Sequence, residues 1–210
     1  MGNGVGPSAE LLPTGATRDY AQRNIKACVA CRPAMRPIRV HSRRPKSRDG
    51  FAATLSRDLN KPVQSVDSWE ACVRDADIVV EASRLRKPEP LLKTDWIKRG
   101  SLVVPYGTMS AVELSLTDIM NKMVVDDWGQ CRKGLPFGAL RQHVDSDRLH
   151  EGNLHAELGQ IVAGKKSGRE SDVETILFWH RGLSITDVAL GHAILTKATR
   201  SAVGQVLRFS

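Results

Sequence analysis

Ile78-Val79-Val80-Glu81-Ala82 is a short, nearly continuous apolar run with β-branched residues in its first half. Such a run is typical of a strand that is buried on both faces, as in a parallel sheet covered by helices. Leu102-Val103-Val104 and Met123-Val124-Val125-Asp126 repeat the pattern further along, and weaker strands are expected at Ile38-Arg39-Val40-His41 and at residues 175–179. Helical segments lie between these runs. The alternation predicts an α/β fold of the Rossmann-like, doubly wound type with a mostly parallel sheet.

The remaining elements are predicted from helical periodicity and from glycine and proline breaks. The helical pattern starts near Ala9, with its better part after Pro13 and Gly15. The expected helices cover residues 20–31, 48–59, 68–75, 116–121, 154–163 and 184–202. A weak strand is expected near Val63 and a last strand at residues 206–209.

Length and composition restrict the class of protein. The 210 residues suit one domain with a sizeable core. No apolar run approaches the ~18 residues of a membrane span, the N-terminus lacks a secretory signal pattern, and the four cysteines are scattered. We therefore expect a cytoplasmic protein without a membrane partner. The net charge of +8 invites a nucleic-acid partner, but aromatic residues make up only 5% and are not interleaved with basic ones, so none is predicted.

The N-terminal stretch Gly2-Asn3-Gly4-Val5-Gly6-Pro7 has the composition of a turn that cradles a phosphate. Glycines permit the tight bend and the close approach of the backbone to a pyrophosphate, and the following helix offers free N–H groups. Gly2, Gly4, Val5 and Gly6 are accordingly predicted cofactor contacts. Because only Met1 precedes this stretch, the first strand of the sheet is expected to be missing.

Polar and small residues follow several of the predicted strands. In doubly wound sheets ligands bind beyond the carboxyl ends of the strands. A carboxylate after the second strand would accept from the ribose 2′-OH of NAD, whereas arginine accommodates the 2′-phosphate of NADP. Ser42-Arg43 stands at that position, which favours NADP over NAD. The predicted contacts run from the adenosine ribose to the nicotinamide and are Ser42, Arg43, Ala82, Ser83, Gly107, Thr108 and His180.

Other chemistry-bearing residues have simpler explanations. Cys28-Val29-Ala30-Cys31 has C-x-x-C spacing without a second pair, so no metal site is predicted. Asp126-Asp127 at a strand end is interpreted as a helix cap or a structural polar end rather than an acid/base pair. Asp187 is explained by a place in the first turn of the last helix, after Ser184, although it could also face the nicotinamide.

An ordered series of segments resembles the ornithine cyclodeaminase/mu-crystallin family over nearly all of the chain. The segments are Gly2-Asn3-Gly4-Val5, Ile38-Arg39-Val40-His41-Ser42-Arg43, Ala76-Asp77-Ile78-Val79-Val80-Glu81-Ala82-Ser83, Glu157-Leu158-Gly159-Gln160-Ile161-Val162-Ala163-Gly164, Gly168-Arg169, residues 178–182 and Asp187-Val188-Ala189. The resemblance implies a dimeric, NAD(P)-dependent oxidoreductase that transfers hydride at the α-carbon of an amino acid or its imine. Family members include ornithine cyclodeaminase, alanine dehydrogenase, and reductases of ketimines and pyrroline carboxylates.

The resemblance also implies an N-terminally truncated member. Most of the family's substrate and dimerisation domain lies upstream of the matched part, so residues 1–182 are expected to form the NAD(P)-binding domain. Residues 183–210 would then be a remnant of the other domain. The cyclodeaminase's catalytic aspartate falls on Thr108, which cannot act as a carboxylate base, so the specific reaction and the catalytic residue stay open. Thr108 and Asp187 are the catalytic candidates. A non-catalytic binding protein of the mu-crystallin type and an inactive fragment are the alternatives.

Overall fold

The computed structural model describes residues 8–11, 18–34, 37–133, 138–205 and 207. Its strands form one eight-stranded sheet in the order β3-β2-β1-β4-β5-β8-β6-β7, and every described pair is parallel. The strands are β1 (Ser8–Leu11), β2 (Ile38–His41), β3 (Val63–Ser65), β4 (Ile78–Glu81), β5 (Leu102–Pro105), β6 (Lys122–Val125), β7 (Ala156–Glu157) and β8 (Ile176–Trp179). The predicted α/β fold with a mostly parallel, Rossmann-like sheet is confirmed.

Helices and short 3₁₀ turns connect these strands. They are α1 (Arg18–Cys31), α2 (Pro45–Leu59), α3 (Trp69–Val73), α4 (Trp128–Cys131), α5 (Arg141–Asp145), α6 (Leu158–Val162), α7 (Ser184–Arg200), η1 (Thr94–Trp96), η2 (Leu114–Ile119) and η3 (Glu151–Asn153). The helix expected at residues 154–163 is shorter than predicted because β7 occupies its beginning. The strand expected at 206–209 lies mostly outside the described residues.

The expectation of a missing first strand is wrong. Ser8–Leu11 forms β1, which pairs with β2 on one side and with β4 on the other. The sequence Ser-Ala-Glu-Leu has no β-branched residue, and alanine and glutamate are depleted in strands, so propensity gave no sign of it. Pairing on both sides overrides that local preference. Because β1 follows Gly2–Gly6, the connection from the first strand to the first helix is residues 12–17 instead.

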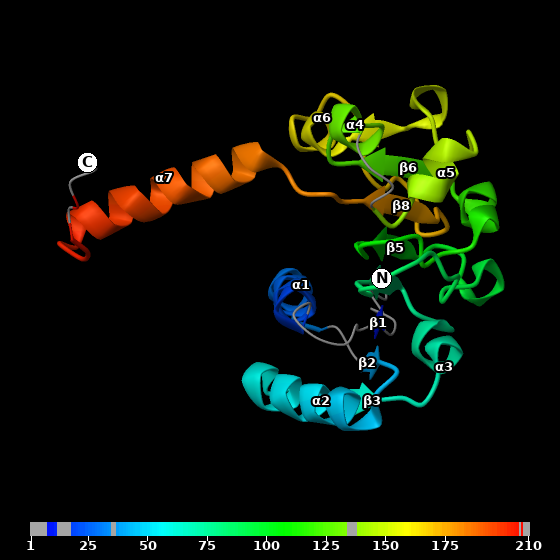
Figure 1. Ribbon diagram of the computed structural model, residues 1–210, viewed down its shortest axis with the longest axis horizontal. Coiled ribbons are helices and arrows are strands. Elements are labelled where there is room, and N and C mark those ends of the chain that lie inside the picture. The colour runs from blue at the N-terminus through cyan, green and yellow to red at the C-terminus, as the bar shows by residue number, and fades with distance from the viewer. Residues whose placement is uncertain (1–7, 12–17, 35–36, 134–137, 206, 208–210) are drawn as a thin grey trace.

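Helices cover the sheet on both faces, as a parallel sheet requires. In Figure 1 α1 and α2 lie on one side of the strands and α3 and α5 on the other. Ile38 and Val40 of β2 pack with Phe51 and Leu55 of α2 in one core cluster. A larger cluster on the opposite face contains Val79, Val103, Leu177 and Trp179, from β4, β5 and β8.

The strand order reverses between β1 and β4. The chain builds outward from β1 through β2 to β3, then crosses to β4 on the other side of β1 and continues through β5. Such a reversal leaves a crevice beyond the carboxyl ends of the two strands, where doubly wound folds bind their ligands. The topology therefore directs attention to the residues that follow β1, β2 and β4.

Helix α7 extends away from the rest of the molecule (Figure 1). None of its side chains is buried, and several large apolar ones are exposed. These are Ile185, Val188, Leu190, Ile194 and Leu195. Within the described part of the chain, no helix combines the length and apolarity needed to cross a lipid bilayer.

Candidate functional site

The parallel strands bring most of the predicted contacts to one edge of the sheet. Ser42 and Arg43 follow β2, Ala82 and Ser83 follow β4, Gly107 and Thr108 come shortly after β5, and His180 follows β8. Because all these strands run in the same direction, their carboxyl ends and these residues lie along a common edge.

A cavity of about 610 Å³ opens beyond β2 and β3. Its size is within the range of small-molecule and cofactor sites. His41, at the end of β2, packs edge-on against Trp69, with ring centroids 4.3 Å apart. Burial lowers the pKa of His41, whose Nδ1 lies 2.7 Å from the carbonyl oxygen of Val66. The lining residues are His41, Ser42, Arg43, Pro45, Arg48, Asp67, Ser68, Trp69, Glu70 and Trp96.

Two arginines line this cavity, and both are already paired with carboxylates. Arg43 donates to the Glu89 carboxylate at 2.5 Å, and Arg48 donates to Asp67 at 2.6 Å. Glu89 belongs to the loop after β4, so the first pair joins the loops that follow the two strands flanking β1. Pro45 begins α2 because its fixed φ suits the first helical position, which ends the β2 loop at Arg44.

Glu81 at the end of β4 is fully buried and ties β4 to β5. Its Oε1 accepts from the backbone N–H of Ser83 at 2.6 Å, and its Oε2 accepts from that of Gly107 at 3.1 Å. Burial raises the pKa of Glu81 to about 7, although these hydrogen bonds oppose the shift. A Cβ at position 107 would lie 2.5 Å from Oε2 of Glu81, so any larger residue there requires the Glu81 carboxylate to shift. Packing against Glu81 therefore explains a glycine at position 107 even without a bound ligand.

Thr108 is fixed by its neighbours rather than poised for proton transfer. Its backbone N–H donates to the carbonyl of Ser83 at 3.1 Å, and its carbonyl accepts from Gly138 at 2.9 Å. The hydroxyl faces the carbonyl of Leu85 at 3.4 Å. Thr108 therefore joins the loops after β4 and β5, and it lacks a neighbouring base among the described residues.

Asp126, directly after β6, organises the loop that follows β8. Its buried carboxylate accepts from the N–H groups of Arg181 and Gly182 at 2.8 and 2.7 Å, and from Asp127 at 2.9 Å. Burial alone would raise the pKa of Asp126, but the hydrogen bonds from His180 and these backbone groups hold it below its usual value. Asp127 caps α4 by accepting from Gln130 at 2.7 Å. The prediction of a cap and a structural polar end is confirmed.

The same aspartate orients His180. Nδ1 of His180 lies 3.0 Å from Oδ2 of Asp126, and the ring stacks on Tyr106 and Phe178 at 5.3 and 5.9 Å between centroids. A carboxylate on one ring nitrogen keeps the proton there and leaves the other nitrogen to exchange protons with a ligand. The His180 side chain is 37% exposed, so Nε2 is accessible at the strand edge.

Asp187 is not brought to this edge, and one group of predicted contacts cannot be located. Asp187 lies in the first turn of α7 with an exposed side chain, and its carboxylate makes no hydrogen bond or ion pair within the described chain. Leu183, not Ser184, is the residue before the helix, and it has no capping side chain. Gly2, Gly4, Val5 and Gly6 lie outside the described residues. The connection that follows β1 contains Gly15 instead.

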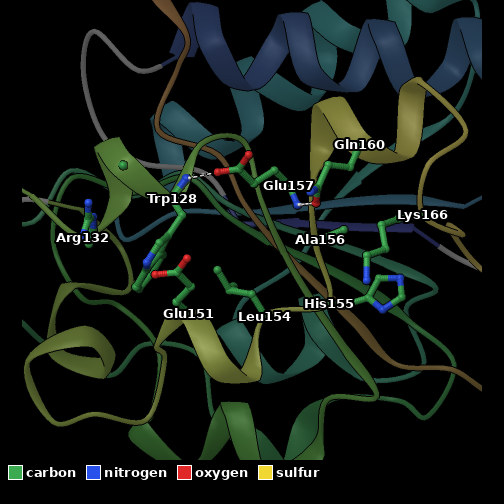
Figure 2. Close-up of a pocket in the computed structure, with 10 residues that line it drawn as sticks. Trp128, Arg132, Glu151, Leu154, His155, Ala156, Glu157, Gln160 and Lys166 are labelled. Atoms are coloured by element: carbon green, nitrogen blue, oxygen red, sulfur yellow. Dashed lines mark hydrogen bonds between the residues drawn. The ribbon is translucent and has the colours of Figure 1, made fainter.

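A second hollow, of about 420 Å³, lies where α4, η3, β7 and α6 meet (Figure 2). Arg132 and Lys166 stand at opposite ends of it, with Glu151 between them. Glu157 accepts from the backbone N–H of Trp128 at 2.9 Å, which joins β7 to α4. The residues that line this hollow carry both positive and negative charges, and none of the predicted cofactor contacts is among them.

Glu81 and Asp126 are functional-site residues that sequence reasoning did not select as such. Each carboxylate stands at the end of an apolar strand, where a charge needs buried partners. An acidic residue at the end of an apolar strand is therefore the sequence signal that could have identified both residues. The partners themselves come from Gly107 and from residues 180–182, far along the chain, and only the folded sheet brings them together.

Comparison with known proteins agrees with the resemblance. The sequence profile of the ornithine cyclodeaminase/mu-crystallin family matches residues 14–202. The chain belongs to this family. An alanine dehydrogenase of Archaeoglobus fulgidus is 28% identical over 176 residues, which is 82% of this chain and 52% of that protein. A Delta(1)-pyrroline-2-carboxylate reductase of Bacillus cereus is 27% identical over 206 residues, 96% of this chain and 62% of the relative.

A solved structure of a similar protein has the same fold. The Thermococcus litoralis Delta(1)-pyrroline-2-carboxylate reductase, in complex with NADH and L-proline, superposes with a TM-score of 0.83 at 26% identity. The match covers 99% of this chain and 62% of the reductase. The chain thus spans between half and two thirds of the length of these family members.

Proposed function

We propose that the chain is the dinucleotide-binding part of an NAD(P)-dependent oxidoreductase that acts on amino acids and their imines. The reaction would be hydride transfer at the α-carbon, as in an amino acid dehydrogenase or a ketimine reductase. The observation that carries this proposal is the sheet reversal at β1 and β4, with conformationally fixed loops along its carboxyl edge, in a member of this family. The NADH and L-proline bound to the Thermococcus reductase support the choice of cofactor and substrate class.

The donor set at the edge fits a dinucleotide. We place the adenosine in the 610 Å³ cavity, where His41 and Trp69 offer aromatic surface and Ser42 offers a hydroxyl. Arg43 after β2 would face the ribose, which supports NADP over NAD. The pyrophosphate would lie at the N-terminus of α1, because the N–H groups and dipole at the start of a helix favour an anion. This proposal uses α1 in place of the Gly2–Gly6 turn.

The nicotinamide half would lie on the other side of β1. Ala82 and Ser83 would border the middle of the dinucleotide, and Gly107, Thr108 and His180 its reactive end. A bound cofactor would supply or accept the hydride. His180 would handle the accompanying proton at Nε2, because Asp126 holds Nδ1 and fixes the orientation of the ring. Asp187 and Thr108 are not retained as acid/base candidates.

The family resemblance also supports the proposed division of the chain. Residues 1–182 would form the cofactor-binding domain, and residues 183–210 would belong to the substrate and dimerisation domain. The exposed apolar side chains of α7 support a partner surface there, and a homodimer is the assembly that we propose. A cytoplasmic location is proposed on the composition alone.

Titration with NADH and NADPH, followed by nicotinamide fluorescence and by calorimetry, tests the proposal directly. Saturable binding of either cofactor is expected, and binding of neither would refute it. Turnover with pyrroline-2-carboxylate, or with pyruvate and ammonia, then separates an enzyme from the alternative, a dinucleotide-binding protein of the mu-crystallin type. We test that alternative for two reasons: mu-crystallin is part of the family's name, and the chain matches only about half of the alanine dehydrogenase.

A further inference from the structure

We propose that Glu89 sets the cofactor preference by competing with a 2′-phosphate for Arg43. This inference rests on the proposed dinucleotide site and names a residue that decides between its two cofactors. Glu89 belongs to neither β1 nor β2, the elements that usually determine this choice in dinucleotide-binding folds. It comes from the loop after β4, on the opposite side of β1.

The geometry of the pair is well defined at both ends. Arg43 stands just after β2, and its guanidinium donates to Oε2 of Glu89 at 2.5 Å. The backbone of Glu89 is held by a hydrogen bond from its N–H to the carbonyl of Ser110 at 2.9 Å. Pro88 and Pro90 on either side restrict φ along the segment. The carboxylate is therefore presented to Arg43 from a constrained backbone.

The charges of the loop make this carboxylate unusual. Between β4 and η1 the sequence carries Arg84, Arg86, Lys87 and Lys93, and Glu89 is the acidic residue among them. A loop that served only to attract an anionic cofactor would have no use for a carboxylate on Arg43. With Glu89 in place, the pair is neutral as a whole, and a 2′-phosphate has to displace one anion to reach the guanidinium.

Both partners remain accessible to a ligand. The side chains of Arg43 and Glu89 are 51% and 46% exposed, so the pair can open without unfolding the loop. A ribose with a 2′-hydroxyl does not need Arg43. It can bind while the pair stays closed, with its hydroxyl donating a hydrogen bond to Glu89. The closed pair thus reduces the preference for NADPH that Arg43 provides, and opening the pair restores it.

Equilibrium binding to the whole chain tests the proposal with NADPH, NADH, 2′,5′-ADP and 5′-AMP as probes. Glu89→Gln keeps the shape of the side chain and removes its charge. We expect it to raise the ratio of NADPH to NADH affinity about fivefold, the upper range for loss of an exposed ion pair. The ratio for 2′,5′-ADP over 5′-AMP should rise equally, because the nicotinamide plays no part in it.

Two further variants exclude other causes. Glu151→Gln removes the same charge from η3, at the far end of the sheet, and should leave both ratios unchanged. In an Arg43→Ala background, Glu89→Gln should no longer change the ratios. An unchanged ratio in Glu89→Gln, or an equal change in the Arg43→Ala background, would overturn the role of Glu89. If the wild-type chain binds none of the probes, the proposed function itself fails.

Discussion

An alanine at position 107 would place its Cβ 2.5 Å from Oε2 and 2.7 Å from Oε1 of Glu81. Glu81 is fully buried and both oxygens accept backbone hydrogen bonds, so its carboxylate can shift away only by giving up those bonds. The substitution must therefore crowd this buried site and push the carboxylate off its backbone donors.

The cost follows from these two effects. Overpacking of a close-packed site costs about 1–3 kcal/mol, and loss of a hydrogen bond to a charged group costs about 1.5–3 kcal/mol. Gly107→Ala should thus lower the free energy of unfolding by about 4 kcal/mol. That is a large part of the ~5–15 kcal/mol that stabilises an average domain.

Urea unfolding followed by circular dichroism measures this loss. Gly159→Ala in α6 is the matched control, because its Cβ would meet no atom within 4 Å and alanine is the better helix former. It should leave stability unchanged or raise it slightly. In a Glu81→Ala background most of the cost of Gly107→Ala should vanish. A loss below ~1 kcal/mol for Gly107→Ala, or an equal loss in both backgrounds, would refute the clash.

Three other perturbations follow from the site. Arg43→Ala should weaken NADPH about fivefold or more and NADH much less, measured by fluorescence titration; equal losses would remove the basis for NADP. His180→Ala should lower turnover of an imine at least about a hundredfold, with partial rescue by added imidazole, while NADH affinity stays within about threefold; undiminished turnover would exclude a proton-handling role. Since burial raises the pKa of Glu81 from 4.5 to about 7 in the folded state, its protonated form favours folding. That stabilisation is complete below about pH 4.5 and is lost as pH rises to 7, by about 3 kcal/mol. Glu81→Gln should flatten urea-unfolding stability over this window, and an unaltered slope would contradict the assignment.

The sequence predicted the strands that carry their own signal. β4, β5 and β6 each contain two consecutive valines next to isoleucine, leucine or methionine, and burial on both faces of a parallel sheet selects such residues. β1 was missed because Ser8–Leu11 is specified by its two neighbours, not by its composition. The predicted phosphate turn at Gly2–Gly6 lies outside the described residues and stays a prediction.

The predicted contacts after β2, β4, β5 and β8 share one edge because parallel strands end together, which is a rule that sequence order alone can use. The pairings within the site could not be predicted in this way. Arg43 and Glu89 are 46 residues apart, and Asp126 and His180 are 54 apart. Such contacts depend on strand order, and β8 takes its place between β5 and β6 only in the folded sheet.

The two halves of the edge are held by different kinds of electrostatics, and this has a functional consequence. On the side proposed for the nicotinamide, the buried carboxylates of Glu81 and Asp126 accept hydrogen bonds from backbone N–H groups and fix the loops around the proposed reacting atom. On the side proposed for the adenosine, Arg43 pairs with Glu89 in solvent, where an ion pair contributes little to stability. Substitutions that change cofactor preference should therefore cost little folding free energy, whereas substitutions at the reactive end should reduce stability and geometry together. The adenosine side is the part of this site where specificity can change independently of the fold.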